Sequence, residues 1–120
     1  MKLTVKDLYD LKAGLNDILD KELPTSVAFS IQQNFKKVGD ELKPSDEVRK
    51  KITEKYKEHI TEDGRIPDDV KREAFRNETK ELADQEVKIA LKKFKLSDLG
   101  EEIKPRTLGL LSVILEEDKK

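Results

Sequence analysis

Residues 23–35, LPTSVAFSIQQNF, carry no charged side chain, although 42% of the 120-residue chain is charged. The proline at the second position is tolerated in the first turn of a helix, and hydroxyl residues that can cap this turn follow it. Val27, Ile31 and Phe35 then recur at steps of four, which predicts a helix with one apolar side. Phe29 lies about 200° from Val27 around such a helix, so it faces away from that side.

A first amphipathic helix is predicted before this stretch, over about residues 5–20. Thr4 followed by Asp7 is typical of a helix start, because the hydroxyl and the carboxylate cap the first backbone N–H groups. Apolar residues follow at steps of three and four, namely Leu8, Leu11, Leu15 and Ile18. Since the connection at the Leu-Pro pair is short, we expect an antiparallel helical hairpin over about residues 4–60.

The course of the second helix past Pro44 is open. The residue before a proline is biased away from the helical conformation, which favours a break and a fresh helix. The apolar spacing from Val38 through Val48 to Ile52 keeps one register across the proline, which favours a single kinked helix. The sequence supports both interpretations.

A turn and a third helix are predicted after the hairpin, at the start of a second part that covers about residues 61–116. Asp63 and Gly64 form a pair that is typical of tight turns. Pro67 and the two acids after it indicate the first turn of a helix, because acids are favoured at the positive end of the helix dipole. We expect this helix to run to about Asp84.

A β-strand is predicted where the hydrophobic period changes. Val87, Ile89 and Leu91 alternate with lysine and alanine, which is the period of a strand with a polar outer face. A lone strand must pair, and the candidate partners are residues 64–66 and 102–104. We therefore expect a small sheet of two or three strands.

The last predicted element is a C-terminal helix that starts near Pro105. Its inward side consists of Leu108, Leu111 and Leu115. Further apolar residues continue around the helix, and a helix that is apolar on every side must be covered on every side. A domain of this size covers part of it, so Leu110 and Val113 are predicted to face outward. Residues 117–120 are expected to form a charged tail.

These elements define the expected fold, a single domain over residues 1–120. Its class is α+β and mostly α, with an antiparallel helical hairpin, a small two- or three-stranded sheet and a C-terminal helix. The N-terminus lacks the apolar core of a signal peptide, and no apolar run approaches the length of about 20 residues that spans a bilayer. A cytoplasmic protein is expected.

Composition excludes several functions. The chain has no cysteine, which excludes disulfides, thiol catalysis and cysteine-ligated metals. The 25 basic and 26 acidic residues give a net charge of −1, so nucleic-acid binding is not favoured. His59 is the single histidine and does not define a metal site with the scattered acids. Without a phosphate-binding or nucleophile motif, we expect no enzyme, no cofactor and no metal.

The order of elements resembles a family of short uncharacterised proteins of tailed phages and prophages. The matching pieces are Leu23-Pro24 with its Val/Ala segment, Asn34-Phe35-Lys36-Lys37, Glu81-Leu82 with Glu86-Val87-Lys88-Ile89, and Ile103-Lys104-Pro105 before the apolar last helix. This resemblance spans nearly the whole chain. It implies a phage origin and a small accessory role without catalysis, and it carries over no catalytic residue.

The leading hypothesis is a phage-type protein that binds another protein through Phe29, Leu110 and Val113. Buried apolar anchors dominate such interfaces. The partner is expected to be a phage structural protein during virion assembly, or a host enzyme such as a defence nuclease that the protein inhibits. It would act in the host cytoplasm or on the virion. The alternatives are a homo-oligomeric helical protein and, less favoured, a nucleic-acid-binding module.

Overall fold

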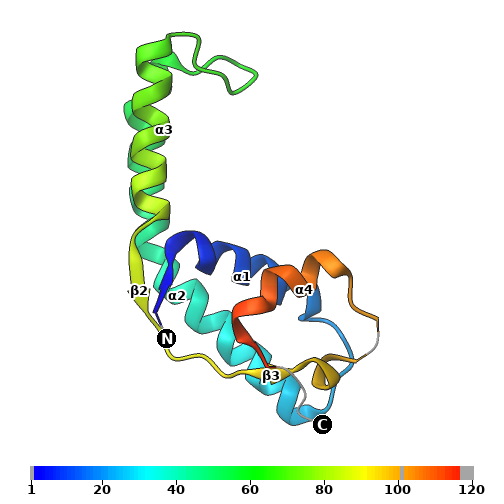
Figure 1. The fold of residues 1–120 in the computed structure, drawn as a ribbon. Helices are drawn as coiled ribbons and strands as arrows, with labels where there is room; N and C mark the ends of the chain where they lie inside the picture. Colours follow the sequence, from blue (N-terminus) through cyan, green and yellow to red (C-terminus); the bar gives the residue numbers. More distant parts are fainter. Residues whose placement is uncertain (1, 101, 117–120) are drawn as a thin grey trace.

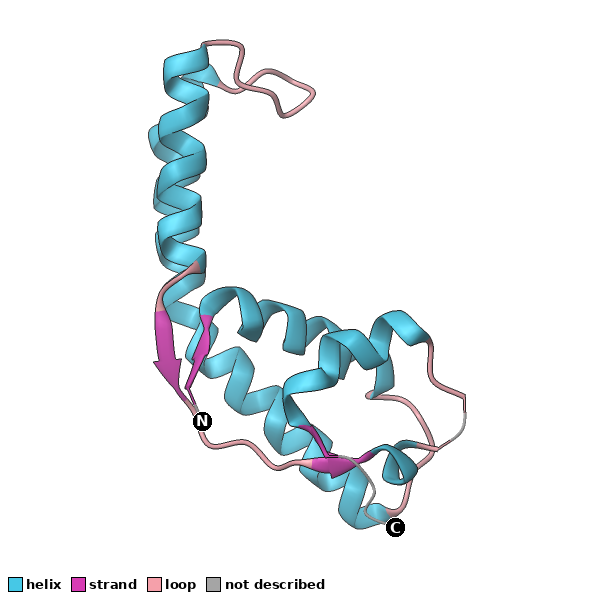
Figure 2. Cartoon of the chain, viewed as in Figure 1, coloured by secondary structure: helices cyan, strands magenta, loops and turns pink. Residues whose placement is uncertain are grey.

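The computed structural model describes residues 2–100 and 102–116 (Figure 1). Within these residues the helices are α1 (Val5–Ile18), α2 (Thr25–Lys55), α3 (Asp69–Ala83) and α4 (Pro105–Leu111). Short 3-10 helices cover Lys57–His59, Leu96–Leu99 and Ser112–Ile114. The strands are β1 (Lys2–Thr4), β2 (Glu86–Lys88), β3 (Phe94–Lys95) and β4 (Leu115–Glu116). The predicted mostly α fold with small sheets is confirmed (Figure 2).

The chain forms a body from which a helical arm projects (Figure 1). We call residues 45–84 the arm, because α3 lies there beside the C-terminal part of α2. In the body, α1 packs against both the N-terminal part of α2 and α4. The molecule measures 54 × 28 × 24 Å along its principal axes, and the arm accounts for the long dimension.

The core of the body joins the predicted apolar sides of α1 and α2. The α1 residues Leu8, Leu11 and Leu15 are fully buried, and each such side chain stabilises the fold by about 1.5–3 kcal/mol. The buried residues of α2 that meet them include Ile31, Val38 and Leu42. The capping box at Thr4 and Asp7 is also present, with both hydrogen bonds at 3.1 Å.

Pro44 bends α2 and does not break it. The helix continues from Thr25 to Lys55, and Figure 1 shows that it changes direction between the body and the arm. A proline has no N–H to donate to the carbonyl of Asp40, and its ring pushes that carbonyl away, which bends a helix. Of the two interpretations of the sequence, the single kinked helix is confirmed, and the bend aims the arm away from the body.

Pro44→Ala is expected to raise the free energy of unfolding by about 1 kcal/mol. Alanine restores the missing backbone hydrogen bond, which contributes about 0.5–1.5 kcal/mol, and removes the clash of the proline ring, but the unfolded chain gains back the freedom that proline removed. Urea unfolding followed by circular dichroism measures this change. A loss of stability would show that the body and arm pack well only around the bent helix.

The predicted strand is shorter than expected, since β2 ends at Lys88 and Ile89 and Leu91 lie beyond it, and it pairs with the N-terminal strand. β2 lies antiparallel to β1, with Leu3 opposite Val87, and neither candidate partner segment pairs with it. The expectation for residues 64–66 and 102–104 was therefore wrong. Lys2 and Glu86 add an ion pair of 2.7 Å across the two strands. This pairing ties the start of the body to the end of the arm.

An extended segment after β2 crosses α2 and is held there by a buried amide. Asn34 Nδ2 donates to the carbonyl of Lys92 at 2.9 Å, and the N–H of Lys92 donates to Asn34 Oδ1 at 3.0 Å. Asn34 is fully buried, although the amide is polar. Lys37 Nζ donates to the carbonyl of Ala90 at 3.1 Å nearby. The side chain of Asn34 therefore takes the place of a neighbouring strand.

The last helix is shorter than predicted. α4 ends at Leu111, a 3-10 turn follows, and Leu115 belongs to β4, which pairs in parallel with β3. Leu111 is fully buried, whereas Leu108 and Leu115 are half-buried. α4 approaches α1 closely at Gly14, and the predicted tail at 117–120 lies outside the described residues.

Candidate functional site

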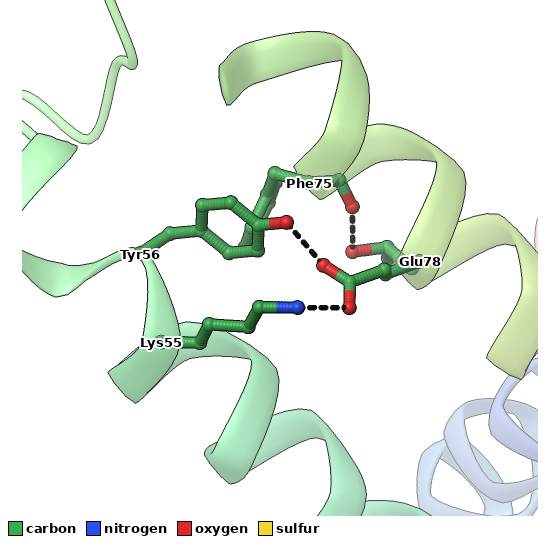
Figure 3. Close-up of polar contacts among 5 residues, drawn as sticks. Lys55, Tyr56, Phe75 and Glu78 are labelled. Carbon is green, nitrogen blue, oxygen red and sulfur yellow. Dashed lines mark hydrogen bonds and ion pairs between the residues drawn. The ribbon is translucent and has the colours of Figure 1, made fainter. Parts of the chain in front are cut away.

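A polar cluster joins the two helices near the end of the arm (Figure 3). The Tyr56 hydroxyl donates to Glu78, and Lys55 Nζ lies 2.8 Å from the other carboxylate oxygen. The Tyr56 ring meets the Phe75 ring edge to face, with centroids 5.5 Å apart and planes at 85°. Tyr56 is buried, so this cluster fixes α3 against α2 and orients Phe75.

Hydrogen bonds between residues close in sequence shape the loop at the tip of the arm. The N–H of Thr61 donates to the carbonyl of Arg65 at 2.8 Å, and Gly64 adopts a φ of 80° that favours glycine. Asp68 then caps α3 by accepting from the N–H groups of Val70 and Lys71 at 2.9 and 3.1 Å. The turn predicted at the Asp-Gly pair is confirmed, and it carries the loop to one side of α3.

The arm is expected to loosen in acid. The hydrogen bonds from Lys55 and then Tyr56 lower the pKa of Glu78 below its usual value. The hydrogen bond from the backbone N–H of Lys71 likewise lowers the pKa of Asp68. A lowered pKa in the folded state means that the stabilisation is complete above the unfolded value of about 4.3 for glutamate. This stabilisation is lost as the pH falls through the pKa of the folded state. The pH dependence of the NMR chemical shifts of the Tyr56 ring measures the loss.

Glu78→Gln tests this pH dependence. The variant is expected to show disturbed Tyr56 ring shifts already at neutral pH and a weaker change between neutral pH and pH 3, because its amide does not titrate. Glu73→Gln is the matched control, since this exposed residue lies about 140° from Glu78 around α3 and outside the cluster. Equal acid responses in the Glu78 variant and the unmodified chain would contradict the assignment.

A groove of about 790 Å³ runs along one side of the arm. The tip loop contributes Gly64, Arg65 and Ile66. The rest of the lining comes from one side of α3, namely Arg72, Phe75, Arg76, Thr79, Lys80 and Ala83. Because α3 residues three and four apart fall on one side of the helix, the groove follows the helix for most of its length.

The groove has an apolar floor and a basic rim. Ile66, Phe75 and Ala83 supply apolar surface, and none of the acidic residues that the structure describes lines the groove. Two of the basic side chains have acidic neighbours, since Arg72 pairs with Asp69 and Arg65 with Asp63. Within the described residues, Arg76 and Lys80 make no ion pair. The groove therefore offers positive charge above an apolar surface.

A second hollow of about 290 Å³ continues the groove toward the body, because Thr79 and Ala83 line both. Its other walls come from α1 and α2, where Arg49 lies 4.8 Å over the centre of the Tyr9 ring. The Tyr9 hydroxyl donates to Asp46, and burial raises the pKa of Tyr9. The concave surface thus extends from the tip loop to α1.

The residues predicted to bind a partner lie on the body and not in this groove. Phe29 is 62% exposed and Val113 is 37% exposed, so both reach the surface as predicted. Leu110 is half-buried, because its Cβ faces Gly14 of α1. The prediction that Leu110 faces outward was wrong in this respect, since α4 uses that side to approach α1.

The groove was not predicted from the sequence. The apolar side of this helix is marked there by Val70, Ala74, Phe75 and Leu82. Val70 is in fact 77% exposed. The available signal was the spacing of Arg72, Arg76 and Lys80, which places them on one side of a helix. His59 is exposed on its 3-10 turn, and the described residues hold no cluster of acids and histidine suited to a metal ion.

Comparison with known proteins finds no match for this chain. No protein-family model matches the chain, and no curated protein or solved structure shows significant similarity to it. None of the helices that the structure describes is long and apolar enough to cross a membrane. The resemblance to phage proteins therefore stays a prediction.

Proposed function

We propose that this chain is a small accessory protein that acts by binding another protein along its arm. The observation that carries the proposal is the groove beside α3, with an apolar floor and two cations, Arg76 and Lys80, that make no ion pair among residues 2–100 and 102–116. In addition, α3 has no fully buried residue although it is amphipathic. A helix that stays half-covered gains stability when another chain covers its open side.

The biological role is proposed from the sequence resemblance. A phage-type accessory protein of this kind serves virion assembly, or it inhibits a host enzyme such as a defence nuclease. Phe29 and Val113 offer a second apolar contact on the body. Both roles need binding and no catalysis, and the identity of the bound protein separates them.

Site-specific crosslinking tests the proposal. A photoreactive amino acid replaces Thr79 in the groove or, as a control, the exposed Glu41 on the body part of α2. Each full-length variant is expressed in phage-infected cells, irradiated, and its adducts are identified by mass spectrometry. We expect one protein adduct from position 79 and none of the same mass from position 41.

The mass of the adduct decides between the rival functions. A virion protein supports assembly, and a host enzyme supports inhibition. An adduct of twice the mass of this chain would replace the proposal with a homo-oligomer, which light scattering would then confirm. The same adducts from both positions, or none from position 79, would contradict binding at the groove.

A further inference from the structure

We infer that the groove receives an acidic amphipathic helix of the partner protein, an inference that rests on the proposed function. Three properties of the groove carry it, namely its length along α3, its small and apolar floor, and its basic rim. Each property restricts the chemistry of the segment that fits there.

The length of the groove matches a helix. Its lining on α3 runs from Arg72 to Ala83, which is about 17 Å, or three helical turns. The tip loop closes the upper end with Arg65 and Ile66. A helix laid in this groove would pack along α3 and meet the tip loop at one end, and two packed helices cover each other's side chains.

The floor allows a helix to approach closely. Thr79 and Ala83 are small and lie at the middle and lower part of the groove, where a partner's larger apolar side chains fit. Phe75 and Ile66 provide apolar surface near the tip. The partner helix therefore carries apolar residues at steps of three and four on the side that meets this floor.

The rim selects for acids on one flank of that helix. Arg76 and Lys80 are four residues apart, lie on one edge of the groove and have no acidic partner among the described residues. Glutamates four residues apart on the partner helix can pair with both. Arg72 and Arg65 already have acidic neighbours, so Arg76 and Lys80 supply most of the selectivity.

A nucleic acid fits this site less well. Binding of single strands combines cations with aromatic faces on which bases stack. Phe75 is the only aromatic residue among those that line the groove, and the Tyr56 ring packs against it edge to face. An apolar floor offers nothing to a phosphate backbone, whereas it suits the apolar side of a helix.

Peptide binding tests the inference on the full-length protein. The probe is a fluorescein-labelled helical peptide of about 15 residues, with leucines on one side and glutamates four apart on one flank of that side. Its match has glutamine in place of every glutamate. We expect anisotropy titrations to show saturable binding of the acidic peptide, and binding at least about tenfold weaker for the glutamine peptide.

Charge reversal locates the binding site. Arg76→Glu with Lys80→Glu is expected to weaken binding of the acidic peptide at least about tenfold. The matched control is Lys50→Glu with Lys51→Glu, which makes the same change of charge on exposed residues of α2 outside the groove. The control is expected to change binding by less than about threefold. Circular dichroism checks that both variants keep their helices.

Several outcomes would overturn the inference. They are equal binding of the glutamic acid and glutamine peptides, equal effects of the two charge reversals, no peptide binding, or displacement of the peptide by single-stranded DNA or RNA of similar length. These outcomes leave the proposed function standing if crosslinking from position 79 still captures a protein. If crosslinking fails as well, both the inference and the proposed function fall.

Discussion

Replacing Asn34 with leucine is expected to lower the free energy of unfolding by about 3 kcal/mol. The leucine has a similar size, but it cannot bond the N–H and the carbonyl of Lys92, which now bond the amide at 3.0 and 2.9 Å. Leaving a donor and an acceptor without partners beside a buried side chain costs about 1–3 kcal/mol for each group. The segment from Ile89 to Phe94 would loosen, although both ends contribute to the core.

Lys37→Ala is the matched control for this prediction. Lys37 comes from the same helix and bonds the carbonyl of Ala90 at 3.1 Å, but this contact is exposed. Its removal is expected to change the free energy of unfolding by less than about 0.5 kcal/mol, because water replaces the lost donor. Urea unfolding followed by circular dichroism compares the variants. Equal effects of the two substitutions would show that Asn34 contributes no more than a surface contact.

The sequence predicts those elements whose causes are local. The spacing of Leu8, Leu11 and Leu15 identifies α1, because one face of a helix repeats with the helical period. Thr4 and Asp7 identify its start, since a capping box needs only residues three apart. The course of α2 at Pro44 is not determined by local sequence alone. The local preference at a proline competes with the packing of the whole helix, and only the folded chain shows that packing prevails.

Pairing between distant segments could not be predicted in the same way. β2 shows the alternation of a strand in the sequence. Thr4 is instead typical of a helix cap, and no local pattern shows that Lys2–Thr4 pairs with Glu86–Lys88. Asn34 lies among apolar residues of α2 and interrupts their pattern. Its role depends on the backbone of Lys92, which carries no side-chain signal. Hydrogen bonds to distant backbone groups leave no pattern in the sequence.

The candidate site was predictable only in part. Arg76 and Lys80 lie on one side of a helix in any helical interpretation of residues 69–83. Arg65 and Ile66 also line the groove, because the tip loop lies on the same side of α3. The position of the loop depends on its backbone geometry. The exposure of Phe29, outside the groove, was predictable because helical spacing alone places it away from the core. Exposure of a single side chain is thus predictable, whereas a groove built by two segments is not.

Gly14→Val is expected to lower the free energy of unfolding by about 3 kcal/mol and to weaken the docking of α4. A Cβ at this position would lie 2.9 Å from the Cβ of Leu110 and 2.9 Å from Cδ2 of Leu111. Valine adds two more carbons to a contact that the first carbon already overfills, and overpacking of a core costs about 1–3 kcal/mol or more. Since Leu111 is fully buried, it has no free space into which to move.

Gly39→Val separates this packing effect from helix propensity. Gly39 lies inside α2, and a Cβ there would meet nothing within 4 Å. Valine forms helix slightly better than glycine, so the control is expected to gain up to about 0.5 kcal/mol. Opposite signs in urea unfolding would assign the loss at Gly14 to the contact between α1 and α4. A gain at both positions would show that α4 moves away from α1 at little cost, and that the close approach contributes little to the fold.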